Sequence, residues 1–317
     1  MAGEFDLISK YFRPLAGPEG LDLADDAACV PRSGSDDIIV TKDMLIEGVH
    51  FRSQDPAESI GHKALAVNVS DCVAKGATPY LYWLGLALTD GADENWLERF
   101  SGGLKAAQQA FGCKLAGGDT TATSGPRTIS ITLLGTVPNG QMVKRSGANV
   151  GDDIYVTGTL GDAALGLWCL SNDIQEKFTL VSAYQKPIPP AMFGQGMRNL
   201  ASSSADVSDG LLADSGHIAA ASGVSMNLWQ NKLPLSAGAT QLLQNKPDLW
   251  PNVWAGGDDY QIVFTAPVPA RGKLIQLADK SGIRISRIGQ VSDGQGVQLL
   301  DPAGEIVQVA SGGYTHF

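Results

Sequence analysis

The sequence predicts an α/β protein with two domains. Three observations support this prediction: strand-like and helix-like segments alternate along the chain, a cluster of turn residues interrupts the alternation, and 317 residues exceed the usual size of one domain. The turn cluster covers residues 140–151, where N-G-Q, S-G-A and V-G-D follow one another. We therefore predict an N-terminal domain at residues 1–140 and a C-terminal domain at residues 141–317.

The N-terminal half combines apolar or β-branched runs with two helical patterns. One helix is predicted over residues 59–75, because Gly76 and Pro79 are typical stop signals just after it. A second helical pattern covers residues 94–111 and ends at Gly112. The predicted strands of this half are 38–42, 80–88, 114–116 and 128–137.

The alternation resumes after the turn cluster. A strand at 154–157 precedes a helix that begins at Asp162, and further helices are predicted from Pro190 and after Asp209. The remaining predicted strands are 224–228, 260–265 and 283–291, and residues 297–309 resemble a hairpin. Several connections are too short for crossover helices, so mixed or antiparallel sheets are as readily expected as parallel ones.

The composition argues against several functional classes. The formal net charge is −10 and no basic run is present, which disfavours nucleic acid and anionic membranes as partners. The four cysteines show no C-x-x-C spacing, which favours free thiols in a reducing cytoplasm over a zinc site. No apolar run is long enough to span a bilayer, and no signal-peptide pattern is evident. We therefore expect a cytoplasmic protein.

Seven aspartates stand in short glycine-rich or helix-starting segments. Because like charges repel, a fold that gathers these carboxylates needs cations to offset the cost. Mg²⁺ prefers oxygen ligands and keeps part of its coordination for water or substrate phosphate. The pattern therefore predicts phosphoryl-transfer chemistry with several Mg²⁺ ions. The aspartates are Asp25, Asp26, Asp43, Asp71, Asp119, Asp206 and Asp209.

A structural role could explain each segment by itself. Asp71 ends an apolar helical stripe and could tilt into solvent, and the A-G-G-D-T-T segment around Asp119 could be an ordinary turn. Ser208 or Asp209 could cap the helix that follows, although a helix N-terminus also attracts phosphate. The adjacent acids Asp25 and Asp26 could form a solvated turn. The joint occurrence of these segments favours a binding site.

Two basic side chains extend the candidate site. Arg145 lies near the predicted domain boundary, where a guanidinium could clamp a phosphate, or it is a surface arginine. His50 in E-G-V-H-F could touch a substrate, or it is a packed or exposed histidine. The sequence has no G-x-x-x-x-G-K-[ST] and no H-R-D with D-F-G, so a nucleotide would be bound by another route.

The motifs together resemble those of the thiamine-monophosphate kinase family, in the superfamily that includes aminoimidazole ribonucleotide synthetase and selenophosphate synthetase. The shared blocks run nearly from end to end. They are G-E-F-D-L-I, D-D-A-A, D-M-L-I-E-G-V-H-F, H-K-A-L-A-V-N-V-S-D, G-G-D-T-T, R-S-G-A-N-V-G-D, V-T-G-T-L-G-D, D-V-S-D-G-L, A-G-G-D-D-Y and G-Y-T-H-F.

The resemblance implies ATP-dependent phosphorylation of thiamine monophosphate to thiamine diphosphate, as a step of thiamine diphosphate biosynthesis. It also implies an aminoimidazole ribonucleotide synthetase-like fold, with an N-terminal mixed sheet that pairs in a homodimer and a C-terminal α/β domain that closes a cleft. The implied nucleotide contacts are Gly118, Asp119, Arg145 and Ser208, and the implied substrate contacts are His50, Asp258 and Tyr314.

The resemblance further implies a set of metal-binding positions. Lys42 is counted with this set because it stands where the family usually carries threonine or serine, and its ammonium would weaken one Mg²⁺ site or replace its charge. The positions are Asp26, Thr41, Lys42, Asp43, Asp71, Asp119, Asp206 and Asp209.

The expected mechanism is direct in-line transfer without a covalent nucleophile from the protein. A phosphate monoester with a second pKa of about 6 is largely dianionic at neutral pH, so its oxygen attacks without a strong general base. Two alternatives remain open from the sequence: another ATP-using enzyme of the superfamily, and a non-catalytic protein that binds nucleotide or thiamine phosphate.

Overall fold

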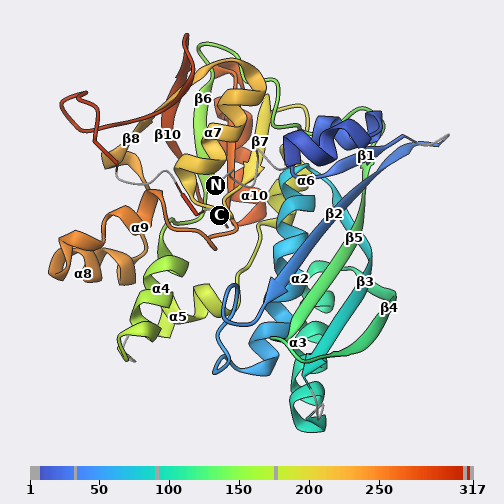
Figure 1. The fold of residues 1–317 in the computed structure, drawn as a ribbon. Coiled ribbons are helices and arrows are strands. Elements are labelled where there is room, and N and C mark those ends of the chain that lie inside the picture. The colour runs from blue at the N-terminus through green and yellow to red at the C-terminus, as the bar shows by residue number, and fades with distance from the viewer. Residues whose placement is uncertain (1–7, 32–33, 90–92, 175–177, 310–312, 315–317) are drawn as a thin grey trace.

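The computed structural model describes residues 8–31, 34–89, 93–174, 178–309 and 313–314. Most of the G-E-F-D-L-I segment, with the last three residues of G-Y-T-H-F, lies outside the described residues. The described chain forms two sheets with helices packed against them (Figure 1). This arrangement confirms the predicted mixed α/β class.

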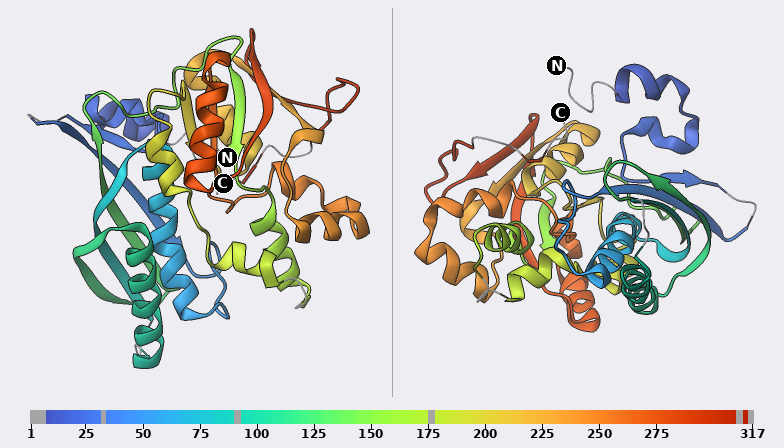
Figure 2. Two further views of the ribbon diagram at one scale, coloured as in Figure 1. Left: turned by 180° about the vertical axis from the view of Figure 1, so that it is seen from behind. Right: turned by 60° about the horizontal axis from the view of Figure 1, so that its bottom comes forward.

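The first sheet is mixed, as predicted. Its strand order is β1-β2-β5-β3-β4, and only β3 and β4 run parallel. Two long helices cover one of its faces (Figure 2). The strands are β1 (Ala28–Val30), β2 (Asp36–Ile46), β3 (Thr78–Thr89), β4 (Lys114–Thr123) and β5 (Thr128–Pro138), and the helices are α2 (Ala57–Ala74) and α3 (Glu94–Phe111).

The two faces of the first sheet differ in burial. On β5, Ile129, Ile131 and Leu133 are fully buried against the helices, at the two-residue spacing of a strand. The opposite face, here called the outer face, carries exposed apolar side chains from three strands, including Met44 and Trp83. The described structure leaves this face without a covering layer.

The second sheet has helices on both faces. Its strand order is β11-β8-β10-β6-β9-β7, with β11 and β8 as its parallel pair. The strands are β6 (Asp153–Thr157), β7 (Ser203–Asp206), β8 (Ser225–Trp229), β9 (Ile262–Ala266), β10 (Ile285–Ser292) and β11 (Gly296–Leu300). The helices of this half are α4 (Asp162–Ser171), α5 (Phe178–Gln185), α6 (Ala191–Gly196), α7 (Leu211–Ser222), α8 (Ala237–Asn245), α9 (Pro251–Trp254) and α10 (Arg271–Ser281).

Alternating residues of β6 show how the second sheet is covered. Ile154 and Val156 pack in the cluster that includes α7 and α4, whereas Tyr155 packs in the cluster that includes α6 and α10. Short helical turns complete the described chain. They are Ile8–Phe12, Arg13–Leu15, Pro18–Leu23, Gln230–Lys232, Pro247–Leu249 and Val268–Ala270.

Helix α2 connects the two halves. It is buried on nearly all sides, because it packs against the first sheet, against α3 and against α6 and β7 of the second half. Its fit to α6 is close: a Cβ on Gly194 would lie 2.4 Å from the carbonyl oxygen of Val73. The same fit to α3 depends on Gly61 and Gly103. Residues of α2 can therefore reach both sheets.

Two sequence-based assignments need correction. Strand β4 does not end at Ala116 but continues through the glycines to Thr123, so the segment around Asp119 is a strand and not a turn. Residues 297–309 do not form a regular hairpin, because β11 pairs parallel to β8 and only an isolated bridge joins Leu300 to Ile306.

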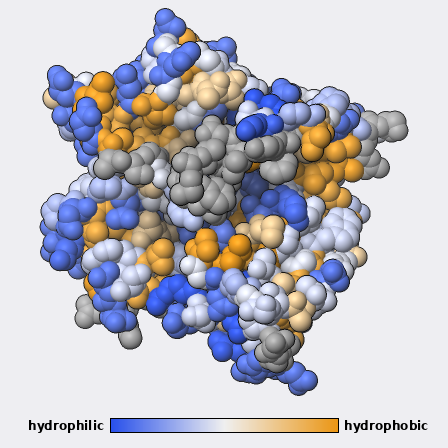
Figure 3. All heavy atoms as spheres, in the orientation of Figure 1, coloured by the Kyte–Doolittle hydropathy of each residue, from blue (hydrophilic) through white to orange (hydrophobic). Residues whose placement is uncertain are grey.

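The surface seen in Figure 3 mixes hydrophilic and hydrophobic residues. Among the described residues, no helix has the length and apolar character needed to cross a membrane.

Candidate active site

Three carboxylates from distant parts of the chain meet beside α2. Asp26 precedes β1, Asp71 lies in the last turns of α2, and Asp206 ends β7. One oxygen from each lies within 4.8 Å of the others. The Ser70 hydroxyl donates a 2.7 Å hydrogen bond to Oδ2 of Asp206, which fixes that carboxylate against the helix. The structure thus brings these predicted ligands together; we call them the aspartate cluster.

Strand β2 supplies two more predicted residues to the same side. Asp43 is paired with buried Ile131, so its side chain faces α2. The buried Asn68 side chain accepts a hydrogen bond from the backbone N–H of Asp43 (3.1 Å) and another from the Thr41 hydroxyl (3.4 Å). Asn68 therefore positions this part of β2 against the helix.

Burial and mutual repulsion make the cluster favourable for a cation. Burial, followed by the charge of Asp26, raises the pKa of Asp206 to about 7, and burial with Asp26 and Asp209 raises the pKa of Asp43 to about 6. Burial and the Asp43 and Asp206 carboxylates raise the pKa of Asp71 well above its usual range. Neutralisation by protons or by a cation relieves this cost.

Asp26 differs from its neighbours because two cations contact it. Arg145 forms an ion pair with Oδ1 of Asp26, and Lys75 lies 2.5 Å from Oδ2. Burial opposes the ionisation of Asp26, but Arg145 and Lys75 outweigh it and lower the pKa of this carboxyl. Asp25 is held in the same network through Lys75 (2.9 Å) and the backbone N–H of Arg145 (2.9 Å).

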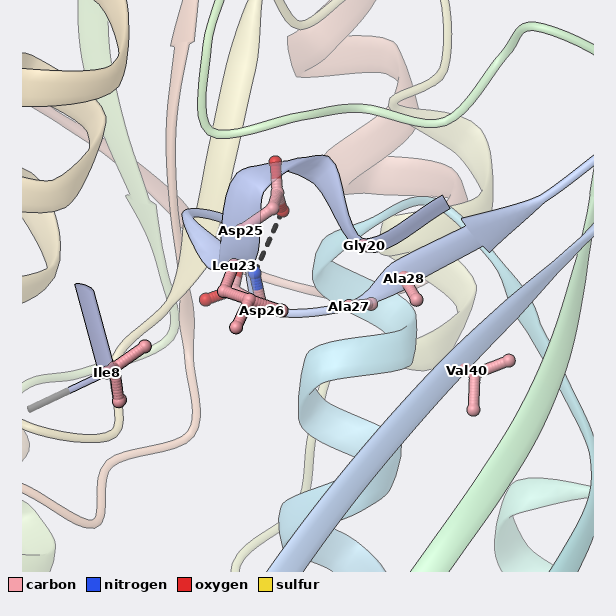
Figure 4. Close-up of a pocket in the computed structure, with 8 residues that line it drawn as sticks. All are labelled: Ile8, Gly20, Leu23, Asp25, Asp26, Ala27, Ala28 and Val40. Atoms are coloured by element: carbon pink, nitrogen blue, oxygen red, sulfur yellow. Dashed lines mark hydrogen bonds between the residues drawn. The ribbon is translucent and has the colours of Figure 1, made fainter. Parts of the chain in front are cut away.

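A cavity of about 410 Å³ borders this turn (Figure 4). Asp25, Asp26 and Ala27 line it from one side, and Ile8, Leu23 and Val40 add apolar surface. The backbone N–H of Asp26 donates to Oδ1 of Asp25, which holds the two acids in a fixed turn. The cavity reaches this turn, although the side chains of Asp25 and Asp26 are only 6% and 1% exposed.

The D-V-S-D-G loop after β7 is organised by a residue from the following helix. Oδ2 of buried Asp214 accepts 3.1 Å hydrogen bonds from the backbone N–H groups of Ser208, Asp209 and Gly210. Gly210, and neither Ser208 nor Asp209, is the N-cap of α7. Asp214 therefore presents Ser208 and Asp209, two predicted ligand residues, in one loop conformation.

A second group joins the predicted substrate residues His50 and Asp258. The Lys63 ammonium lies 3.0 Å from Oδ2 of Asp258 and donates a 3.0 Å hydrogen bond to the His50 carbonyl. The Tyr260 hydroxyl donates to Oδ1 of Asp258 (2.9 Å). Both Asp258 (φ +70°) and Tyr260 (φ +49°) adopt left-handed backbone conformations, which are uncommon for residues with a side chain. We call these four residues the Lys63 group.

The His50 ring has a defined orientation. Its Nδ1 accepts a 3.0 Å hydrogen bond from the backbone N–H of Ile46, so the proton of the neutral ring lies on Nε2. Tyr314, the third predicted substrate residue, lies beside the loop after β7, where its backbone N–H donates to the carbonyl of Asp209 (3.0 Å).

Helix α2 sets the spacing between the two groups. Lys63 and Asp71 are eight residues apart on this helix, which corresponds to about 12 Å along its axis. Carboxylates of both groups affect Tyr260. Burial raises the pKa of its hydroxyl, and the negative charges of Asp258, Asp43 and Asp206 raise it further. One rigid element thus carries parts of both groups.

Lys42 and Asp119 are not brought to the aspartate cluster within this chain. The Lys42 ammonium donates a 2.6 Å hydrogen bond to Ser130 on the outer face of the sheet. Asp119 is paired with Gly85, which is paired with Ser130, so Asp119 shares that outer face. Its strand, with the adjacent Gly118, is three strand spacings, or about 14 Å, from β2. Within one chain, Lys42 therefore lies away from the other predicted metal positions, and its role there stays a prediction.

Comparison with known proteins identifies the family. The family model for "AIR synthase related protein, N-terminal domain" matches residues 24–137. The thiamine-monophosphate kinase of Escherichia coli strain K12 is 38% identical over 328 residues, which cover 99% of this chain and 98% of that protein. The chain belongs to the thiamine-monophosphate kinase family. The Caulobacter vibrioides kinase is 39% identical over 300 residues, 93% of this chain and 85% of the relative.

Solved structures of thiamine-monophosphate kinases share the whole fold. AaThiL complexed with AMPPCP and TMP has a TM-score of 0.88 and 32% identity, and the match covers 99% of this chain and 97% of that one. The enzyme from Stenotrophomonas maltophilia K279a has a TM-score of 0.81 and 39% identity, with 96% and 98% covered. The aminoimidazole ribonucleotide synthetase-like fold expected from the motifs is thereby confirmed.

The donor set of the aspartate cluster in this kinase family member fits Mg²⁺. Its ligand atoms are carboxylate oxygens, one each from Asp26, Asp71 and Asp206, at mutual distances that a single ion can bridge. Burial and the neighbouring carboxylates raise the pKa of Asp71 and of Asp206, so a positive charge beside them would stabilise their ionised forms. A hard divalent cation would supply it.

Several positioning residues were not found from the sequence. Lys63, Asn68, Lys75, Asp214 and Tyr260 act through contacts between segments far apart in the chain, which spacing alone does not reveal. A partial signal existed for the two lysines. Lys63, Asp71 and Lys75 are eight and four residues apart in a segment rich in apolar residues, where charges need partners.

Proposed function

We propose that this protein transfers the γ-phosphoryl group of ATP to the phosphate of thiamine monophosphate, giving thiamine diphosphate and ADP. The observation that carries this proposal is the spacing on α2: a buried aspartate cluster lies about 12 Å along the helix from the Lys63 group. Membership of the thiamine-monophosphate kinase family supports the choice of substrates, since AaThiL forms a complex with AMPPCP and TMP.

The proposed site divides binding between the two groups. Mg²⁺ ions held by Asp26, Asp71 and Asp206, with Asp43 and Asp209 beside them, would neutralise the phosphate oxygens of both substrates. The Arg145 guanidinium would clamp the nucleotide phosphates, and Ser208 would face them from the loop that Asp214 holds. His50, Asp258 and Tyr314 would hold thiamine monophosphate.

The chemical step requires no protein nucleophile. An oxygen of the acceptor phosphate forms a bond to the γ-phosphorus while the bond to the β–γ bridging oxygen breaks and ADP leaves. The acceptor is largely dianionic at neutral pH, because its second pKa is about 6. The residues of this chain therefore contribute positioning and charge stabilisation.

We further propose that the outer face of the first sheet pairs with that of a second copy in a homodimer. Val30, Met44 and Trp83 are exposed apolar side chains of this face on β1, β2 and β3, and an apolar patch of this kind favours a partner surface. Because Gly118 and Asp119 lie away from the aspartate cluster of their own chain, we assign them to the nucleotide bound by the partner. The domain boundary at residue 140 falls between β5 and β6 in this proposal.

A cytoplasmic location completes the proposal. The four cysteines form no disulfide among the described residues, which suits a reducing compartment.

The proposed reaction is tested by following ADP release from Mg-ATP. We expect sustained release only when thiamine monophosphate is present, because the acceptor oxygen is the attacking group. Release at the same rate without acceptor would indicate an ATPase. Tight binding of both ligands without release would indicate a non-catalytic binding protein and contradict the proposal.

A further inference from the structure

Lys75 is a fully buried lysine at the end of α2. Its side chain has no exposed surface, and its ammonium lies 2.9 Å from Oδ1 of Asp25 and 2.5 Å from Oδ2 of Asp26. It also donates a 2.7 Å hydrogen bond to the carbonyl of Ser204 on the second sheet. Two carboxylate oxygens and one carbonyl oxygen thus surround the ammonium. A buried ammonium with these partners stays charged and fixed in place.

The two cations that contact Asp26 differ in how easily they can leave. The Arg145 side chain keeps 14% of its surface exposed, whereas that of Lys75 keeps none. Lys75 directly follows α2, and the chain then turns at Gly76, which has a φ of +72°. Moving its ammonium would require moving the end of the helix that α6 covers. We therefore expect Lys75 to stay beside Asp26, and Arg145 to be able to move away from it.

We propose that Lys75 is a built-in cation of the aspartate cluster, which occupies Oδ2 of Asp26 and takes the place that a divalent ion would otherwise have beside Asp25 and Asp26. Added Mg²⁺ then binds through Asp71, Asp206 and Oδ1 of Asp26, once Arg145 has left that oxygen. Lys75 is thus a positioning residue: it acts through Asp26 and touches neither substrate. This inference rests on the proposed function in one respect, the binding of Mg²⁺ by the aspartate cluster.

A fixed positive charge beside a cation site has a measurable consequence. The ammonium contacts Asp26, one oxygen of which lies within 4.8 Å of one oxygen each of Asp71 and Asp206, so it repels an ion bound there. Lys75→Met keeps most of the side-chain volume and removes the charge. We expect it to tighten Mg²⁺ binding about tenfold, which corresponds to about 1.4 kcal/mol.

The test measures ion binding to the full chain without nucleotide. Calorimetry gives the Mg²⁺ affinity, and electron paramagnetic resonance of Mn²⁺ gives the number of bound ions. We expect Lys75→Met and Lys75→Gln to bind Mg²⁺ about tenfold more tightly than the wild type, or to bind one further Mn²⁺ ion. The glutamine variant keeps a hydrogen-bond donor for Ser204, so agreement between the two variants assigns the effect to the charge.

A cation pair far from the cluster provides the control. Arg287 pairs with buried Asp153 on the second sheet, where Arg271 also contacts the same carboxylate. Arg287→Gln is expected to lower stability equally with and without Mg²⁺ and to leave ion binding unchanged.

The outcomes separate this inference from the proposed function. Unchanged Mg²⁺ affinity and Mn²⁺ number in both Lys75 variants would contradict the role of Lys75 alone. A wild type that binds no ion, with or without AMPPCP, would contradict the metal site of the proposed function and this inference with it. If the variants fold only in millimolar Mg²⁺, a dissolved ion replaces the ammonium and the inference is supported. Variants that remain unfolded at every Mg²⁺ concentration would contradict it.

Discussion

Asp71 combines burial and like charge in one side chain. Burial and the neighbouring carboxylates raise its pKa, so the negative charge is costly unless a cation is bound. We predict that Asp71→Asn lowers kcat about 100-fold or more at saturating Mg²⁺, because the amide binds the ion poorly. The same variant is expected to be at least as stable as the wild type in metal-free buffer. Near-normal turnover would remove Asp71 from the metal site.

Lys63 connects the substrate residues from two parts of the chain. Its side chain is 3% exposed and bonds both His50 and Asp258. Lys63→Met should raise KM for thiamine monophosphate about tenfold or more and leave KM for ATP unchanged, because a charge-assisted hydrogen bond is lost near one substrate only. Steady-state kinetics with each substrate varied in turn checks this. Lys105→Met, at an exposed position on α3, is the control and should change neither constant.

The aspartates that lie together were predicted from the sequence more successfully than the positions of the lysines. Asp26, Asp43, Asp71 and Asp206 stand in motifs, and the structure places them together. Lys42 was grouped with them by its position next to Asp43, yet successive strand residues point to opposite faces. This period of two, applied to β2, would have placed Lys42 on the other face from Thr41 and Asp43. The partners of Lys63 and Lys75 come from strands or loops far away in sequence, which local spacing does not predict.

At the scale of elements, α2 depends on close contact with α3. A Cβ on Gly103 would lie 2.0 Å from the carbonyl oxygen of Glu58, whereas one on its neighbour Gly102 would meet nothing within 4 Å. We predict that Gly103→Ala destabilises the protein by about 1–3 kcal/mol by overpacking. Gly102→Ala should stabilise it by about 1 kcal/mol, because alanine is the better helix former. Denaturant unfolding of both variants tests the pair, and equal effects would refute the close contact.

The free energy of unfolding should depend on pH, because the carboxyls of Asp43 and Asp206 are buried where α2, β2 and β7 meet. The folded-state pKa is raised to about 6 for Asp43 and to about 7 for Asp206, above the ordinary value of 3.8. Their contribution is therefore fully present below about pH 4 and is lost as the pH rises through about 6 to 7. Because Mg²⁺ prefers the charged carboxylates, its stabilising effect should grow over the same interval.

Thermal unfolding with EDTA and with Mg²⁺, compared across this pH range, measures that difference. A Mg²⁺ effect that does not change with pH would show that these carboxyls are already ionised without metal.

Helices were predicted correctly where the residues that begin and end them are next to them in the sequence. Helix α3 begins after Asp93, whose side chain accepts the backbone N–H of Asn95, and ends at Gly112 in the left-handed conformation. Strand β4 was predicted too short, and glycines, such as the two that follow Ala116, usually weaken strands. In β4 they allow close approach instead, since a Cβ on Gly118 would lie 2.0 Å from the carbonyl oxygen of Leu84. That contact depends on the neighbouring strand and is absent from the local sequence.

At the scale of the whole molecule, one chain holds an incomplete set of the predicted ligands. Asp119 lies on the outer face of the first sheet, and the aspartate cluster lies beside α2 on the other face. If Asp119 acts on the partner's nucleotide, Asp71→Asn and Asp119→Asn chains complement each other. A mixed dimer then contains one site with both aspartates intact.

Mixing the two inactive variants under conditions of subunit exchange tests this arrangement. We predict recovery of about a quarter of the wild-type activity, because about half of the dimers are mixed and each has one intact site. No recovery, with exchange verified by mass, would show that Asp71 and Asp119 act within one chain.

Identification of the reaction product tests whether this site phosphorylates thiamine monophosphate. Wild-type protein and Asp71→Asn are incubated with Mg-ATP and, separately, thiamine monophosphate, thiamine or an aminoimidazole-pathway substrate, and the products are resolved by chromatography. We predict thiamine diphosphate from the wild type with the monophosphate alone, and at least a 100-fold lower rate from Asp71→Asn. Product from another acceptor, or equal rates from both proteins, would contradict the account.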